Sequence, residues 1–166
     1  SAAQANTLVF QRSIHDMDCT GMGTTLVAAL AGEEQTSLLN EGDSRAYHIT
    51  QHGITQLTRD HSLVQDLVQR GELTQDEARN HPRKNLITRA LGAEPELNAD
   101  YFLHPVKPGE FVLLCSDGLS NVVDGTGLAE LLTCHPDPEE CCRALLARAV
   151  EQGAPDNVTA VVAQLS

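Results

Sequence analysis

Two apolar runs in this chain are each bordered by an aspartate, and this pattern limits how the chain can fold. Residues 111–115 read Phe-Val-Leu-Leu-Cys, and Asp117 follows them closely. Residues 158–165 are largely apolar and come just after Asp156. Both runs predict strands, and the continuous second run is expected to be buried on both faces. A carboxylate where a buried strand meets a turn suits a hard divalent cation with oxygen ligands.

Length, charge and cysteine content narrow the class of protein. The 166 residues match one domain with a sizeable core, so we expect residues 1–166 to form a single domain. The formal net charge of −12 argues against nucleic acid or an anionic membrane as the main partner. No run has the length of a membrane span, and residues 1–20 lack a signal-peptide pattern. Five cysteines without a C-x-x-C pair favour the reducing cytoplasm.

The first third of the chain predicts one helix followed by short strands. Residues 2–14 have helical periodicity, but no N-cap marks their beginning. Glycine-containing turns then separate four strand-like segments, at 24–31, 36–40, 46–50 and 54–57. Connections this short predict an antiparallel meander.

Residues 58–95 look like a helical insertion between strands. Ser62 and Thr74 each occupy an N-cap position, and Gly71 and Pro82 end the two helices. His61 is expected to cap the first of these helices, with a catalytic base as the alternative. We predict that this segment is a flap beside the active site.

The rest of the chain alternates strands and helices. Strands are expected at 97–104 and 110–115, and helical residues follow Gly118. Asp137 as N-cap with Pro138 at the first helical position predicts the last helix.

A third aspartate, Asp43, occupies the turn Gly42-Asp43-Ser44. Together with Asp117 and Asp156 it predicts three carboxylates that converge on a divalent metal, which would activate water and neutralise a phosphoryl group. The alternative is three unrelated turns that each carry a common turn residue.

Six motifs occur in an order that resembles the metal-dependent serine/threonine protein phosphatases of the PPM, or type 2C, family in its bacterial form. The resemblance runs from about residue 4 to 165. The motifs are Gly21-Met22-Gly23-Thr24-Thr25-Leu26-Val27, Gly42-Asp43-Ser44-Arg45-Ala46-Tyr47, Asp60-His61, Ile87-Thr88-Arg89-Ala90-Leu91-Gly92, Ser116-Asp117-Gly118-Leu119 and Asp156-Asn157-Val158-Thr159.

This resemblance implies an α+β fold, a four-layer αββα sandwich of two antiparallel sheets with a Mn²⁺ or Mg²⁺ pair at one end. By the same resemblance, Asp117 and Asp156 are ligands of the paired ions, and residues 58–95 are the flap. Asp43 and Asp117 match the acidic residues that hold a third, weaker ion. Asn121 stands where a further ligand of that ion is usual, and a neutral amide there is expected to weaken its binding.

Supporting residues are expected around these ligands. Gly118 and Asn157 each follow a proposed ligand and are expected to support the site. Lys84 and Arg89 give the flap a local positive charge that attracts a phosphorylated substrate, or else they are solvated cations at helix ends.

The N-terminal motifs of the family do not occur in this sequence. These are an Arg-x-x-Asn-Glu-Asp segment and an Asp-Gly-Met-Gly-Gly-His segment, which supply the phosphate-binding arginine, a bridging aspartate and the proposed general acid. The chain therefore resembles the C-terminal two-thirds or so of a phosphatase, and its catalytic residues are expected upstream of Ser1.

Three functions follow from these observations. The first is removal of phosphate from phosphoserine and phosphothreonine in proteins by metal-activated water, with phosphorylated proteins and a serine/threonine kinase system as partners. The second is a non-catalytic binding module, and the third is a metal-binding or structural domain. Uncovered sheet edges are expected to make the chain self-associate.

Overall fold

A computed structural model describes residues 1–135 and 137–165, and the chain forms two compact units within it. The first unit comprises Ser1–Leu26, Asn40–Asp43 and Arg59–Asp100. The second comprises Val27–Leu39, Ser44–Thr58 and the residues from Tyr101 onward. Whether residues 1–166 behave as one domain with a flap at 58–95 stays a prediction.

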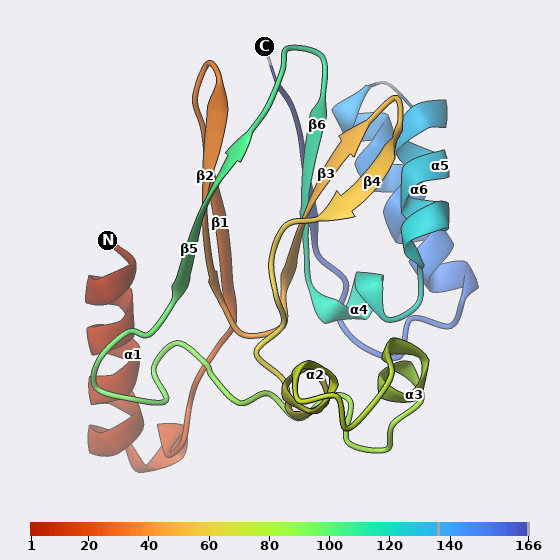
Figure 1. Ribbon diagram of the computed structural model, residues 1–166. Helices are drawn as coiled ribbons and strands as arrows, with labels where there is room; N and C mark the ends of the chain where they lie inside the picture. Colours follow the sequence, from red (N-terminus) through yellow and green to blue (C-terminus); the bar gives the residue numbers. More distant parts are fainter. Residues whose placement is uncertain (136, 166) are drawn as a thin grey trace. The chain divides into compact units, whose positions relative to one another are not determined.

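Figure 1 draws the helices of the first unit, and each of them begins at a side-chain cap. They are α1 (Ala2–His15), the 3₁₀ turn η1 (Met17–Cys19), α2 (Leu63–Gln69) and α3 (Gln75–Arg79). The caps predicted at Ser62 and Thr74 are confirmed, since each hydroxyl accepts a backbone N–H in the first turn of its helix. The prediction that α1 starts without a cap is wrong, because Ser1 and Gln4 form a capping box.

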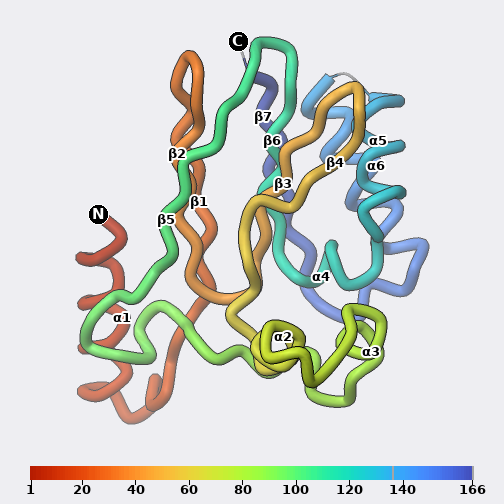
Figure 2. Tube along the Cα trace, viewed as in Figure 1, coloured from red at the N-terminus to blue at the C-terminus, as the bar shows by residue number. Residues whose placement is uncertain are grey.

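A buried asparagine on α1 fixes an irregular segment of the first unit. Residues 80–99 contain no helix or strand, and Figure 2 shows this stretch of the tube, yellow-green to green, between α3 and β5. Asn6 is 2% exposed, and its amide Nδ2 donates to the carbonyls of Glu94 and Pro95 while its Oδ1 accepts the N–H of Gly92 at 2.7 Å. A side chain at Gly92 would collide with Val9, so this motif glycine is needed for close packing on α1.

Within the described residues, seven strands form two sheets. The strands are β1 (Leu26–Ala31), β2 (Gln35–Glu41), β3 (Arg45–Thr50), β4 (Gly53–Gln56), β5 (Asp100–Pro105), β6 (Phe111–Cys115) and β7 (Ala160–Gln164). One sheet has the order β1-β2-β5, and the other has the order β4-β3-β6-β7 with antiparallel neighbours. With the helices, these sheets make an α+β fold, as the sequence predicted.

The predicted meander through the first four strands is wrong, because β2 and β3 belong to different sheets. The connection at Gly42 is not a hairpin turn. Gly42 has φ +105°, and both its N–H and its C=O bond to His61 instead of to a neighbouring strand. These bonds make the chain leave the first sheet after β2.

The helices of the second unit include α4 (Asp117–Ser120), α5 (Gly125–Cys134) and α6 (Pro138–Glu151). The predicted cap at Asp137 is confirmed. Leu128, Leu132, Cys141 and Leu145 of α5 and α6 pack with Leu113 of β6 in one core cluster. The prediction that the last strand is buried on both faces is wrong: β7 lies at a sheet edge, and Val161 is 54% exposed. No helix among the described residues has the length and apolar character to cross a membrane.

Candidate metal centre

Strand pairing brings the backbone segments of Asp117 and Asp156 to the same end of one sheet. In the antiparallel pair of β6 and β7, Cys115 lies opposite Ala160. Asp117 follows the end of β6 as the first residue of α4, and Asp156 precedes the start of β7. The two predicted ligands therefore leave neighbouring strands at one end of the second unit.

Hydrogen bonds of Ser116 join these two segments. Its N–H donates to the carbonyl of Thr159 at 3.1 Å, and its Oγ accepts the N–H of Thr159 at 3.0 Å. The same hydroxyl donates to the carbonyl of Asn157 at 3.3 Å. A Cβ on Gly118 would lie 2.2 Å from that carbonyl oxygen, so the first turn of α4 passes directly over the turn after Asp156.

Each carboxylate has one polar contact that orients it. Asp117 Oδ2 accepts a hydrogen bond of 3.2 Å from the side-chain amide of Asn121. Asp156 Oδ1 accepts the N–H of Asn157 at 2.7 Å. Asp117 is half-buried and Asp156 is exposed, so oxygen lone pairs on both remain accessible to a ligand. That Gly118, Asn121 and Asn157 support a metal site stays a prediction.

The carboxylate oxygens of Asp117 and Asp156 meet some of the requirements of a hard cation. Carboxylate oxygens are the ligands that Mg²⁺ and Mn²⁺ prefer, and no cysteine or histidine contacts the two carboxylates among the described residues. Within residues 1–135 and 137–165, however, no three His, Cys, Asp or Glu side chains gather as a metal-binding group. Two carboxylates leave most of the roughly six oxygen positions around such an ion to water or to other ligands.

The third predicted ligand, Asp43, belongs to the first unit. It is half-buried, follows Gly42 directly and makes polar contacts of its own. Its convergence with Asp117 and Asp156 stays a prediction.

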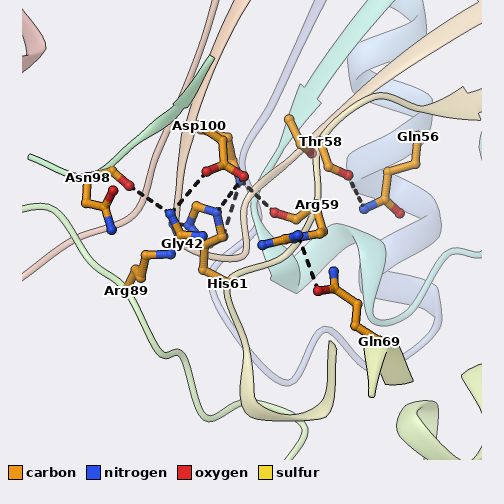
Figure 3. A network of polar contacts seen from close by, with 10 residues as sticks. Gly42, Gln56, Thr58, Arg59, His61, Gln69, Arg89, Asn98 and Asp100 are labelled. Carbon is orange, nitrogen blue, oxygen red and sulfur yellow. Dashed lines mark hydrogen bonds and ion pairs between the residues drawn. The ribbon is translucent and has the colours of Figure 1, made fainter. Parts of the chain in front are cut away.

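The two predicted flap cations differ in their surroundings. Arg89 Nη1 donates to the carbonyl of Asn98 at 2.8 Å and to Asp100 Oδ1 at 3.1 Å (Figure 3). Lys84 is exposed, and its backbone N–H bonds to the carbonyl of His81. Arg89 thus has a role within the folded unit, whereas a contact of either residue with substrate stays a prediction.

Sequence reasoning missed a polar cluster beside the Gly42 turn. His61 is 1% exposed and does not cap α2, because Ser62 does. Its ring accepts the N–H of Gly42 at Nδ1, and its Nε2 lies 3.2 Å from Asp100 Oδ2. Burial raises the pKa of Asp100, but the contacts from His61 and Arg89 outweigh it and hold that pKa below its ordinary value.

Glu41 is also part of this cluster. It is 4% exposed, and its Oε2 has no hydrogen-bond partner in the part of the chain that the structure describes. Burial raises the pKa of this carboxyl, although the positive charge of Arg89 acts in the opposite direction. A glutamate at the polar end of a strand, as in Asn40-Glu41-Gly42, gives no signal in the sequence that it is buried.

Known proteins resemble this chain over nearly all of its length. The serine/threonine phosphatase Stp of Listeria monocytogenes serotype 4b is 40% identical over 161 residues, which is 97% of this chain and 64% of that protein. The chain therefore spans less than two thirds of that relative. No protein-family model matches the chain.

Solved structures of phosphatases also resemble this chain over nearly all of its length. The PPM Ser/Thr phosphatase MsPP of Mycobacterium smegmatis, in complex with cacodylate, is 39% identical with a TM-score of 0.87, covering 98% of this chain and 70% of that one. The catalytic domain of the phosphatase PstP in complex with two manganese ions is 36% identical with a TM-score of 0.86, covering 97% and 67%. With its α+β fold and the ordered motifs, the chain belongs to the PPM family of bacterial serine/threonine protein phosphatases.

Proposed function

We propose that the protein to which this chain belongs removes phosphate from phosphoserine and phosphothreonine in proteins, with Mn²⁺ or Mg²⁺ as cofactor. The observation that carries the proposal is the junction between Ser116 and Thr159, which holds the segments of Asp117 and Asp156 together at one end of a sheet. A PstP relative binds two manganese ions in its solved structure, which supports Mn²⁺ as the cofactor. Phosphorylated proteins, a serine/threonine kinase system and a cytoplasmic location follow from this proposal.

The chain's own residues would hold the cofactor through oxygen atoms. Asp117 and Asp156 are the proposed ligands in the second unit, and the Asn121 amide turns one Asp117 oxygen toward itself and leaves the other available. Asp43 is proposed as a separate ligand in the first unit. A bound divalent cation lowers the pKa of a coordinated water toward neutrality and so supplies a hydroxide nucleophile.

A chimera tests this function. The N-terminal third of the Listeria phosphatase, placed before Ser1, supplies the motifs that this sequence lacks. We expect the chimera to hydrolyse a phosphothreonine peptide in the presence of Mn²⁺, and we expect the 166-residue chain alone to stay near background. Asp117→Asn and Asp156→Asn should each lower kcat/KM on the order of a hundredfold or more, because a ligand carboxylate supports several kcal/mol of charge stabilisation.

Asp137→Asn is the matched control for these variants. It makes the same chemical change at the N-cap of α6, where Asn and Asp are equally good caps. Full activity of the Asp117→Asn chimera would contradict the proposed site. A chimera that binds Mn²⁺ without turnover would instead support the non-catalytic module.

A further inference from the structure

Both backbone polar groups of Gly42, in the Gly-Asp-Ser turn, bond to the same residue. The Gly42 N–H donates to Nδ1 of His61 at 3.1 Å, and the Gly42 C=O accepts the backbone N–H of His61 at 2.9 Å. Asn40 Nδ2 also approaches this carbonyl, at 3.4 Å, and bonds the Arg59 carbonyl at 3.0 Å. The Gly42 N–H belongs to the peptide group that joins Glu41 to Gly42, and the Gly42 C=O belongs to the group that joins Gly42 to Asp43, so the contacts with His61 hold both peptide groups before Asp43.

Packing fixes the same turn from another direction. A Cβ on Gly42 would lie 2.5 Å from a methyl carbon of Thr25, and Gly42 has φ +105°. Only glycine combines this conformation with so close an approach. The direction in which the chain enters Asp43 is thus set jointly by Thr25 and His61.

The contacts of His61 determine its tautomer. Nδ1 accepts a hydrogen bond from an amide, so it must carry a lone pair, and the ring proton must be on Nε2. Nε2 lies 3.2 Å from Asp100 Oδ2. The two atoms are in close polar contact, but the contact does not meet the geometry of a hydrogen bond. A carboxylate beside Nε2 favours the proton there and so keeps Nδ1 free to accept from Gly42.

Asp100 is itself held by the arginine of the Ile-Thr-Arg motif. Its Oδ1 accepts from Arg89 Nη1 at 3.1 Å, while Oδ2 is the atom that faces His61. Figure 3 shows the resulting line of contacts from Arg89 through Asp100 and His61 to Gly42. All four residues belong to the first unit, although they come from separate parts of the sequence.

We propose that His61 is a positioning residue, which aligns the Asp43 carboxylate for a divalent cation by holding the backbone N–H and C=O of Gly42. Asp100 and Arg89 fix the tautomer and the orientation of the His61 ring. This inference rests on the proposed function, because that proposal makes Asp43 a metal ligand. The His61 side chain is fully buried, so it acts through Gly42 and not on a substrate. Loss of a residue that holds a metal ligand in place commonly changes metal affinity by about 10- to 100-fold.

Two substitutions test the roles of the two imidazole nitrogens of His61 separately. In His61→Asn the amide oxygen can take the place of Nδ1 and accept from Gly42. In His61→Gln the amide nitrogen can take the place of Nε2 and donate toward Asp100, but the acceptor for Gly42 is lost. Asp100→Asn leaves His61 in place and removes the charge that selects its tautomer, and Asp76→Asn on the exposed surface of α3 is the matched control.

The experiment uses NMR on the 166-residue chain and needs no turnover. Imidazole ¹⁵N shifts report the His61 tautomer, and the ¹H shift of the Gly42 amide reports its bond to Nδ1. Mn²⁺ alone is then titrated, and paramagnetic broadening of the Asp43 amide gives an apparent Kd, with Asp43→Asn as the check that this carboxylate binds the ion.

We expect His61→Gln and Asp100→Asn to lose the Gly42 bond and to raise the apparent Kd at Asp43 roughly tenfold. His61→Asn and Asp76→Asn should keep Kd close to that of the unmodified chain. Unchanged Kd in His61→Gln and Asp100→Asn after loss of the Gly42 bond would overturn the inference, as would equal weakening in His61→Asn. If the NMR spectra show that neither His61 variant folds, the apparent Kd of Asp100→Asn at Asp43 tests the inference.

Failure of the inference is distinguishable from failure of the proposed function. No broadening at Asp43 in the unmodified chain would remove Asp43 as a ligand and overturn the role of His61 with it. Dephosphorylation by the chimera would still stand in that case if it depends on Asp117 and Asp156.

Discussion

Gly118 and Asn157 approach so closely that a β-carbon on Gly118 would lie 2.2 Å from the carbonyl oxygen of Asn157. The contact is with backbone, which cannot move aside as a flexible side chain can. It sets the spacing between the segment after Asp117 and the segment after Asp156.

We therefore expect Gly118→Ala to lower the free energy of unfolding by about 1–3 kcal/mol, the usual cost of overpacking. Urea denaturation followed by circular dichroism measures this change. Gly125→Ala is the control, because a Cβ there meets nothing closer than 3.5 Å and alanine favours the first turn of α5. Equal stability of the two variants would show that the two segments separate easily.

The second prediction concerns pH and a chain of three side chains in the second unit. Glu110 Oε2 lies at hydrogen-bond distance from His48 Nε2, 2.8 Å, and His48 Nδ1 lies 3.0 Å from His104 Nε2. Burial lowers the pKa of His104 from its ordinary value of 6.5, and the charge of His48 lowers it further, while Glu110 opposes both effects.

Because folding lowers this pKa, the unfolded chain takes up the His104 proton first as the pH falls. The stability that neutral His104 provides is complete above pH 6.5 and decreases as the pH drops from there toward the lowered pKa. We expect His104→Gln, which retains a donor toward His48, to reduce the loss of unfolding free energy between pH 7.5 and pH 5.5. His52→Gln, at an exposed turn, should leave that loss unchanged. Identical pH profiles for all three proteins would contradict this interpretation.

The third prediction concerns the segment expected to be a flap. Residues 80–90 contain no helix or strand, whereas Phe111–Cys115 pair on both sides with β3 and β7. Amide hydrogen exchange should therefore be faster in 80–90 than in Phe111–Cys115, because few backbone hydrogen bonds protect the irregular segment. Mass spectrometry of peptides from both regions measures the rates. Slower exchange in 80–90 would mean that this segment is not a mobile flap.

The fourth prediction concerns the exposed sheet edges. β1 and β7 are edge strands in their two sheets, and apolar Leu30 and Val161 on them are 74% and 54% exposed. Unpaired apolar edge strands recruit other strands, so the 166-residue chain should self-associate at micromolar concentration.

Light scattering after size-exclusion chromatography measures this association. Leu30→Lys and Val161→Lys should shift the chain toward monomer, since a lysine on an edge strand opposes pairing. Ile14→Lys, on the exposed surface of α1, is a control for the added charge alone. A monomeric unmodified chain would show that these edges do not drive association.

Rules that act within one turn of helix made the local structure predictable. Ser62, Thr74 and Asp137 were assigned as N-caps, and each side chain accepts the backbone N–H three residues later. Such a bond depends only on residue type and spacing, so it can be read without knowledge of the rest of the chain. The apolar runs before Asp117 and after Asp156 likewise predicted β6 and β7 within two residues.

The pattern of residues failed where a distant partner decides the outcome. The last strand reads as buried on both faces, but Val161 on β7 is 54% exposed, and among the described strands β7 pairs with β6 at the edge of its sheet. The Gly42 turn reads as a hairpin, but His61, nineteen residues later, bonds to both the backbone N–H and the backbone C=O of Gly42. Hydrophobic periodicity gives the faces of a strand and contains no information about which strands become its neighbours.

The sequence by itself determined the family motifs, the helix caps and the oxygen ligands expected at Asp117, Asp156 and Asp43. Only the tertiary structure revealed how these residues are supported: Ser116 bonded to Thr159, Asn121 to Asp117, and Asp100 behind His61. The physical reason is that a ligand is recognised by its own chemistry, whereas its support depends on hydrogen-bond geometry between segments that meet only after folding.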